Sequence, residues 1–442
     1  MSESASDAQP LSYSSEAANP LPYTREAPEE PPKGALWTIF LIVFIDLLGF
    51  GIIIPLLPRY VPDFTHNPLK VTLLFSVYSV CQFVGAPVLG AMSDRFGRRP
   101  VLFLSQLGSA LGYVLLGVAT TFHWADPGTR LTLVYISRVL DGFTGGNIST
   151  AQAYVSDVTT PQNRAKGMGI LGAAFGIGFT AGPFLGGVLG HYNVSWPAYL
   201  AAVLSALAAV LSWVMLKDTR THKPTEIEAW LHPSRFVPIF RRPVLVQLLC
   251  ISFCVMAAFV MMESTVTMFL DERFGYKEKE VGLYFGFVGL IIVAVQGGLI
   301  GRLTKKLGEW PLAVGGCLFV AAGMIGYTTT AFRPLLSVLL FAGAVNATGR
   351  SLQQPTISSL LSKFSDPRDQ GVVFGLFHGL GSLARVVGPL IAGVAYPYLN
   401  HAGQFVVAGA IAVAMAVWTA ALRQPAPGEA APDAVREAAL EA

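Results

Sequence analysis

The sequence predicts an all-α membrane protein with twelve transmembrane helices arranged in two six-helix bundles. Of its 442 residues, 53% are hydrophobic and only 13% are charged, whereas soluble domains carry about 25% charged residues. Twelve apolar segments approach or exceed the roughly 20 residues that cross a bilayer, and the longest internal polar stretch divides them six and six. Lipid offers no hydrogen bonds to the backbone, so each segment should form a helix.

The spans follow one another with short polar connections. They are predicted at residues 35–57, 69–92, 100–121, 129–151, 166–190, 197–216, 244–270, 281–303, 311–331, 334–356, 371–396 and 401–422. The predicted domains are a disordered N-terminal tail (1–34), an N-terminal bundle (35–216), a linker (217–243), a C-terminal bundle (244–422) and a disordered C-terminal tail (423–442). The first tail is rich in Pro, Ser and Glu and has no apolar core, unlike a signal peptide.

The basic residues are unevenly divided between the two sets of loops. The loops after spans 2, 4, 6, 8 and 10 hold sixteen Lys and Arg, against seven in the other set. Basic residues favour the cytoplasmic side, so both termini and the linker are predicted to be cytoplasmic, with the protein in the inner or plasma membrane. The net charge of +3 gives no reason to expect a nucleic acid partner.

The two halves of the sequence resemble each other. Residues 161–187 and 366–393 both place an Arg three residues before a Gly, and in both a Gly-Pro pair follows about sixteen residues later. Spans 5 and 11 therefore occupy corresponding places in two parallel repeats. Such repeats are typical of transporters whose site lies between the halves.

A charged hinge, residues 90–99 (GAMSDRFGRR), separates spans 2 and 3. Its glycines allow a tight turn, and its Asp can pair with Arg across an interface. The spacing resembles a signature of the major facilitator superfamily, which implies that superfamily's fold and a conformational gating role for Gly90, Asp94, Arg95, Gly97, Arg98 and Arg99. The alternative interpretation is a topology signal.

Span 5 carries small residues at helical spacing, which let helices approach closely in lipid. They are Gly169, Gly178, Gly182, Pro183, Gly186 and Gly187. The pattern resembles the antiporter signature of drug exporters within the superfamily. Generic helix packing is the alternative.

Span 1 contains a carboxyl group, Asp46. A charge at this depth costs about 2.5–3.5 kcal/mol and usually faces a cavity. The following Gly49, Pro55 and Pro58 resemble the first span of drug:proton antiporters, including the tetracycline-resistance efflux group, which implies a role in proton coupling. An Asp satisfied by neighbouring polar groups is the alternative.

Span 4 contains Arg138 and Asp141, which share a helix face and can pair. The resemblance implies that Arg138 takes part in proton coupling, whereas the alternative is a purely structural pair. The stretch that follows, 153–169, resembles the tetracycline exporters. There Asp157 and Arg164 either latch against the hinge, or Asp157 caps a helix.

The second half adds three charged candidates for the substrate cavity: Glu263, Arg350 and Arg385. Glu263 lies near the end of its span and either lines the cavity or is interfacial. Arg350 shares a polar face with Asn346, Gln353 and Gln354, which a lipid-facing helix has no need of.

Other classes of function lack support in the sequence. There is no Walker A motif for ATP hydrolysis and no catalytic constellation, so neither an enzyme nor a cofactor is predicted. The four cysteines are interpreted as apolar packing residues rather than metal ligands.

The resemblance covers about residues 36–422 and implies a monomeric, proton-coupled antiporter in the lipid bilayer. Its expected substrates are small amphiphilic molecules such as drugs or tetracycline-like compounds. Two alternatives remain open: a uniporter or symporter of a small organic metabolite, and a non-transporting receptor or scaffold.

Overall fold

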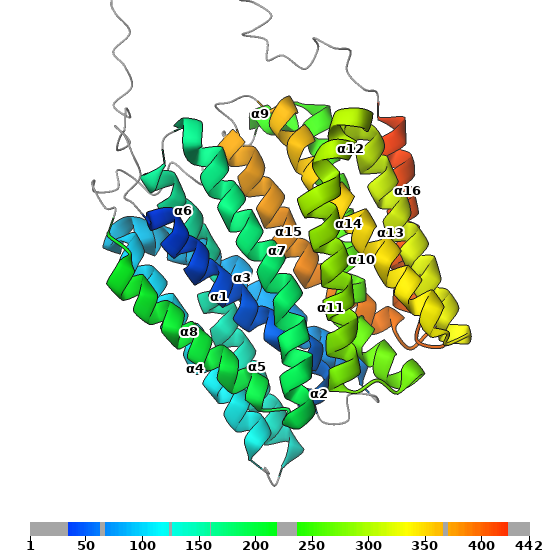
Figure 1. The fold of residues 1–442 in the computed structure, drawn as a ribbon, viewed down its shortest axis with the longest axis horizontal. Coiled ribbons are helices and arrows are strands. Elements are labelled where there is room, and N and C mark those ends of the chain that lie inside the picture. The colour runs from blue at the N-terminus through cyan, green and yellow to red at the C-terminus, as the bar shows by residue number, and fades with distance from the viewer. Residues whose placement is uncertain are drawn as a thin grey trace, which may run out of the picture.

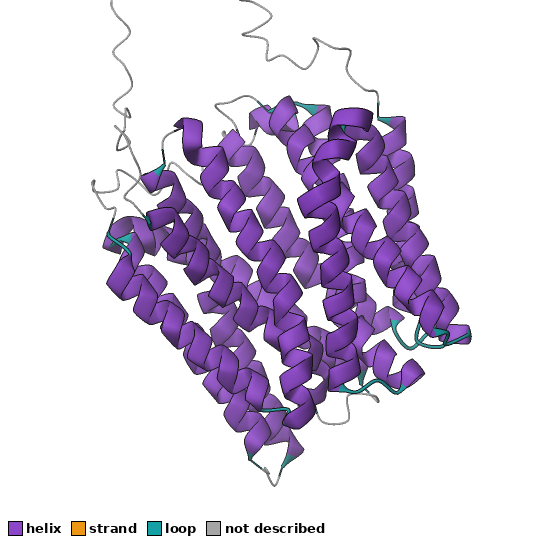
Figure 2. Cartoon of the chain, in the orientation of Figure 1, coloured by secondary structure: helices purple, strands orange, loops and turns teal. Residues whose placement is uncertain are grey.

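The computed structural model describes residues 34–61, 67–122, 126–159, 161–218, 237–365 and 370–422. Every regular element in these ranges is helical (Figure 2). The predicted tails, apart from Gly34, and most of the predicted linker lie outside the described residues.

The helices of the first half follow the six predicted spans. They are α1 (Ala35–Ile53), η1 (Ile54–Leu56), α2 (Leu57–Tyr60), α3 (Pro68–Phe96), α4 (Arg98–Thr121), α5 (Pro127–Thr144), η2 (Gly145–Asn147), α6 (Ile148–Val158), α7 (Pro161–Tyr192) and α8 (Trp196–Met215). The first span is therefore one continuous run in which a 3₁₀ turn at Pro55 joins α1 to α2. The fourth is divided at η2, a turn rich in glycine.

The second half repeats this plan after a short helix, α9 (Val237–Phe240). Its helices are α10 (Pro243–Phe274), α11 (Glu278–Ala294), η5 (Val295–Leu299), α12 (Ile300–Leu307), α13 (Glu309–Phe332), α14 (Leu336–Phe364), α15 (Gln370–Ala395) and α16 (Gly403–Ala421). Each predicted span thus coincides with one helix or one run of helices.

Ten of these stretches in the described chain are long and apolar enough to cross a membrane. The remaining two predicted spans correspond to α5–α6 and α14, which carry Arg138 with Asp141 and Arg350. Their polarity sets them apart from the other ten, and both must find protein rather than lipid around their charges.

Local sequence signals fix where several helices begin and end. The side chain of Asn67 accepts a hydrogen bond from the Lys70 amide, and that of Asp126 accepts one from the Thr129 amide at 2.9 Å, which caps α3 and α5. Proline stands at the first position of both helices, where a missing N–H costs nothing. Gly275, with φ +66°, ends α10 in a left-handed conformation.

The helices form two bundles that meet along two helix pairs (Figure 1). In the first, α1 packs on α7 and α8; in the second, α13 packs on α14 and α16. Across the interface, α7 packs on α11 and α3 packs on α15. Helix α1 begins and helix α16 ends at the same end of the molecule, called the tail side here, and the opposite end, where α2 lies, is called the far side (Figure 1).

The halves touch closely on the far side. Gly187 of α7 lies against the backbone of Gly282 of α11, so neither position has room for a side chain. Gly393 of α15 leaves similarly little space beside Thr72 of α3. Toward the tail side, by contrast, a Cβ added at Gly172 or Gly379 would meet no neighbouring atom within 4 Å. The close contacts between the halves are therefore concentrated at one end.

The glycine contact predicts the effect of a single methyl group. Gly187→Ala should wedge α7 away from α11, because overpacking a tight contact costs about 1–3 kcal/mol. We expect spin labels at the exposed far-side positions Trp196 and Arg333, introduced after replacing the native cysteines, to show a larger distance in this variant. Gly172→Ala, on the same helix but without a close neighbour, is the matched control. Identical distance distributions for both variants would contradict the prediction.

Candidate functional site

A pocket lies between the two bundles, near the middle of the helices that form their interface. Its aromatic lining comes from the first half and consists of Phe50, Phe75, Tyr78 and Phe179, while Val260 is the apolar lining residue of the second half. Its charged lining consists of Arg138 from the first half and of Glu263 and Arg385 from the second. A surface that is mostly apolar with a few charged groups is typical of a site for small molecules. In this conformation, however, the pocket measures only about 20 Å³, room for about one water molecule, so a larger compound would need the halves to move apart.

Arg138 and Asp141 form an ion pair on α5, with 3.1 Å between Nη1 and Oδ2. Each residue is only 1% exposed. The guanidinium also lies over the ring of Tyr113, at 5.6 Å from its centre. The pair satisfies only part of the arginine, because its Nε and Nη2 have no hydrogen-bond partner among the described residues.

Asp46 lies behind this pair, on α1. Its carboxyl group interacts with the side chains of Gln106 and Asn147, and Asp141 is a like charge close enough to repel it. No ion pair of Asp46 is found in the part of the chain that the structure describes. Asp46 is one helical turn from Phe50, which stacks on Tyr78 in the pocket wall at 4.8 Å. The acid is therefore buried close to the pocket without forming part of its wall.

The three charged candidates of the second half lie together. Glu263 on α10 interacts electrostatically with both Arg385 on α15 and Arg350 on α14. Arg350 donates a hydrogen bond to Gln353 Oε1 at 3.0 Å, and its guanidinium lies over the ring of Phe259 at 5.2 Å. Arg350 is not part of the pocket wall, whereas Glu263 and Arg385 are. One acid therefore stands beside two bases.

The glycines of α7 place their helix between the two halves. Gly178, Gly182 and Gly186 lie against Leu47, Gly51 and Ile52 of α1. Gly187 faces the other way, against α11. Pro183 lies within the same helix. Helix α7 thus packs against Asp46's own helix and against the second half at once.

The hinge turns at Gly97, whose φ of +104° suits glycine. Arg98 is its centre: it contacts Asp94 at 2.6 Å and Asp157 of α6 at 3.1 Å. Asp94 remains 52% exposed, and both of these partners belong to the first half. Asp157 therefore meets the hinge through Arg98 rather than through Asp94 or Arg95.

The other hinge residues also stay within the first half. Arg95 lies over the ring of Phe96, and Arg99 lies over Trp213 at 4.5 Å from the ring centre. Gly90 faces Ser149 of α6. The side chain of Arg164 lies outside the described part of the chain.

Comparison with known proteins identifies the family. The model of the Major Facilitator Superfamily matches residues 39–335. The chain belongs to the Major Facilitator Superfamily. It is therefore a member of a superfamily of membrane transporters, and an enzymatic activity has no support.

Relatives and a solved structure extend this result. The chain is 31% identical to the class C tetracycline resistance protein of Escherichia coli, over 82% of this chain and 90% of that protein. It is 28% identical to multidrug resistance protein 2 of Bacillus subtilis strain 168, over 85% and 93%. These relatives confirm the predicted resemblance to the tetracycline-resistance efflux group. The crystal structure of the human organic anion transporter MFSD10 shares the fold, with a TM-score of 0.66, 24% identity and coverage of 88% and 100%.

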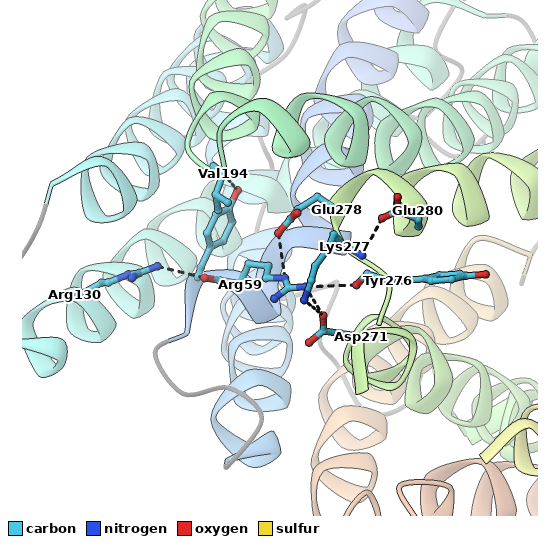
Figure 3. A network of polar contacts seen from close by, with 9 residues as sticks. Arg59, Arg130, Val194, Asp271, Tyr276, Lys277, Glu278 and Glu280 are labelled. Atoms are coloured by element: carbon cyan, nitrogen blue, oxygen red, sulfur yellow. Dashed lines mark hydrogen bonds and ion pairs between the residues drawn. The ribbon is translucent and has the colours of Figure 1, made fainter. Parts of the chain in front are cut away.

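The structure of this superfamily member also shows a charged contact that the sequence did not indicate. Arg59, at the end of α2, binds Asp271 of α10 at 2.5 Å and Glu278 of α11 at 3.1 Å (Figure 3). The backbone carbonyl of Arg59 accepts a hydrogen bond from Arg130 at 3.2 Å. We call Arg59, Asp271 and Glu278 the far-side lock. The only signal in the sequence was that the loop after span 1 carries a basic residue, Arg59, and the corresponding loop after span 7 carries the acids Asp271 and Glu278.

The far-side lock should stabilise the closed far side. Each charge-assisted hydrogen bond contributes about 1.5–3 kcal/mol, so Arg59→Gln should raise the population with an open far side by about tenfold or more. The rate at which a small thiol reagent labels a cysteine introduced at Thr72 measures this opening. Arg273→Gln is the control, because Arg273 contacts Asn400 within its own half. Equal labelling rates in the two variants would show that the far-side lock does not control the opening of the far side.

Proposed function

We propose that the protein is a secondary active exporter that exchanges protons for small amphiphilic compounds, such as drugs or tetracycline-like molecules. The observation that carries this proposal is the pocket between the halves, walled by aromatic rings and charges and backed by the buried acid Asp46. The names of the tetracycline and multidrug resistance relatives support the same substrate class.

Asp46 is the proposed proton carrier. A carboxyl group that is buried beside a second acid and has no ion pair takes up a proton more readily than one paired with an arginine. Its proton matters to the rest of the protein because Gly51 and Ile52, one to two turns along the same helix, contact α7. Glu263 is the second candidate for this role.

Arg138 is the proposed coupling residue. Its partner Asp141 also acts on Asp46, so the charge of Asp46 influences how firmly Asp141 holds the arginine. Because Arg138 lines the pocket as well, it connects the proton site to the substrate site. Arg385 contributes a charge to the second wall of that cavity, and Arg350 interacts with Glu263 of the same wall.

The orientation follows from the basic residues. We propose that the tail side is cytoplasmic, that the membrane is the inner or plasma membrane, and that the protein works as a monomer. The described conformation is then one whose far, non-cytoplasmic side is closed. In the opposite conformation, the hinge residues Asp94 and Arg95 would form a latch with the second half.

The latch gives one prediction. Asp94 is half exposed and bound to Arg98 in the present conformation, so its loss costs little here. If it binds the second half when the cytoplasmic side closes, Asp94→Asn should favour the inward-open state and slow turnover, with little effect on substrate affinity within one state. Cysteine accessibility of the cytoplasmic cavity measures this shift. An unchanged labelling pattern would leave the hinge as a topology signal.

The proposed proton carrier gives a second prediction. Asp46→Asn should abolish uphill efflux driven by a pH gradient while preserving expression, because an amide cannot exchange a proton and is less costly to bury than a charge. Transport of a drug panel is measured on purified protein in liposomes, with a pH gradient for uphill transport and at equal pH for drug exchange. Drug exchange at equal pH should survive.

Glu280→Gln is the control for this experiment, since Glu280 is exposed on the far side. An Asp46→Asn protein that still drives uphill transport at the wild-type rate would exclude Asp46 and direct attention to Glu263. If the wild type moves no compound of the panel under a gradient, the proposed exporter function fails.

A further inference from the structure

Two arginines reach the same pocket from opposite halves of the protein. Arg138 comes from α5 and Arg385 from α15, and both line the pocket. These helices belong to bundles that move relative to each other in any alternating-access transporter. A group held by both arginines would therefore bridge the moving parts.

Two hydrogen-bond donors of Arg138 have no partner among the described residues. These two atoms, Nε and Nη2, are buried, since the residue is only 1% exposed. Buried polar groups are nearly always satisfied in native proteins, so an unsatisfied one at a pocket wall indicates a missing partner. Asp141 is held through Nη1, which leaves the other edge of the guanidinium available.

Arg385 is only partly buried and is also available to a ligand. No hydrogen bond or ion pair of its guanidinium occurs within the described ranges, and the acid that acts on it, Glu263, also acts on Arg350, which lies outside the pocket wall. The second wall of the pocket therefore carries one base and one acid, and that acid is shared with a second base outside the wall.

The chemistry that fits two such arginines is an anion. A guanidinium presents its donors in a planar fork that matches the two oxygens of a carboxylate or sulfonate. A cation would instead leave the unpartnered Nε and Nη2 donors of Arg138 without an acceptor. The rings of Phe50, Tyr78 and Phe179 on the first wall suit a flat apolar body attached to that anionic group.

We propose that the pocket binds amphiphilic organic anions, with the anionic group held between Arg138 and Arg385 and the aromatic body against the first wall. This inference rests on the proposed transport through this pocket but not on the identity of the coupling ion. It assigns to Arg385 a direct contact with substrate.

Three probes with one apolar body and different charges test it: naphthoate, naphthylmethylammonium and naphthalenemethanol. Binding is measured by calorimetry on the full-length protein in lipid nanodiscs. We expect naphthoate to bind most tightly of the three. Arg385→Gln should weaken naphthoate binding by about tenfold or more, the loss expected for one charge-assisted hydrogen bond, and leave the neutral alcohol unaffected. Arg385→Lys should lose less than Arg385→Gln.

The control is Arg302→Gln, because Arg302 is exposed on α12 and outside the pocket. Thermal unfolding checks that each variant is folded. If Arg385→Gln is not, Arg138→Lys replaces it, and naphthoate binding should again weaken selectively. The inference is overturned if the ammonium probe or the alcohol binds as tightly as naphthoate, or if the variant weakens all three alike.

Transport in liposomes separates this inference from the exporter proposal. Gradient-driven movement of neutral and cationic drugs without selective naphthoate binding would overturn the anion site and leave the exporter intact. Selective naphthoate binding without gradient-driven transport of any compound would do the reverse.

Discussion

The hydrocarbon interior of a membrane cannot hydrogen-bond a polar group, and this constraint organises the structure. It forces the backbone into helices. It also favours arrangements in which each charge within a span is surrounded by protein rather than lipid. The two predicted spans that do not belong to the ten most apolar stretches, α5–α6 and α14, carry Arg138 with Asp141 and Arg350. Their charges lie inward, beside or behind the same pocket. The position of the site thus follows from the same constraint as the fold.

The spans were predictable because each depends only on a local run of apolar residues, and proline or asparagine signals near their ends are local too. The buried charges Asp46, Arg138 and Glu263 could be singled out for the same reason. Their arrangement could not, because it depends on how helices pack. The far-side lock lay beyond sequence reasoning altogether, since Arg59 and Asp271 are 212 residues apart and each resembles an ordinary loop charge.

The interface between the halves uses two kinds of contact that differ in physical character. Gly187 and Gly282 bring backbones together, which depends on shape alone. The far-side lock adds directional charge contacts at the rim, which water can replace when they separate. One contact sets how closely the bundles approach, while the other sets how readily they part. The hydrogen bond from Ser76 to the Val386 carbonyl, at 2.9 Å, joins the second helix pair near the level of the pocket.

The glycine contact between α7 and α11 has an evolutionary consequence. Because no side chain takes part in it, this contact does not depend on the residues that line the pocket, such as Phe179 toward the middle of α7. Substitutions there can alter which compounds are accepted without disturbing closure. Specificity and closure can therefore diverge separately, which suits a scaffold whose relatives carry resistance to chemically distinct drugs.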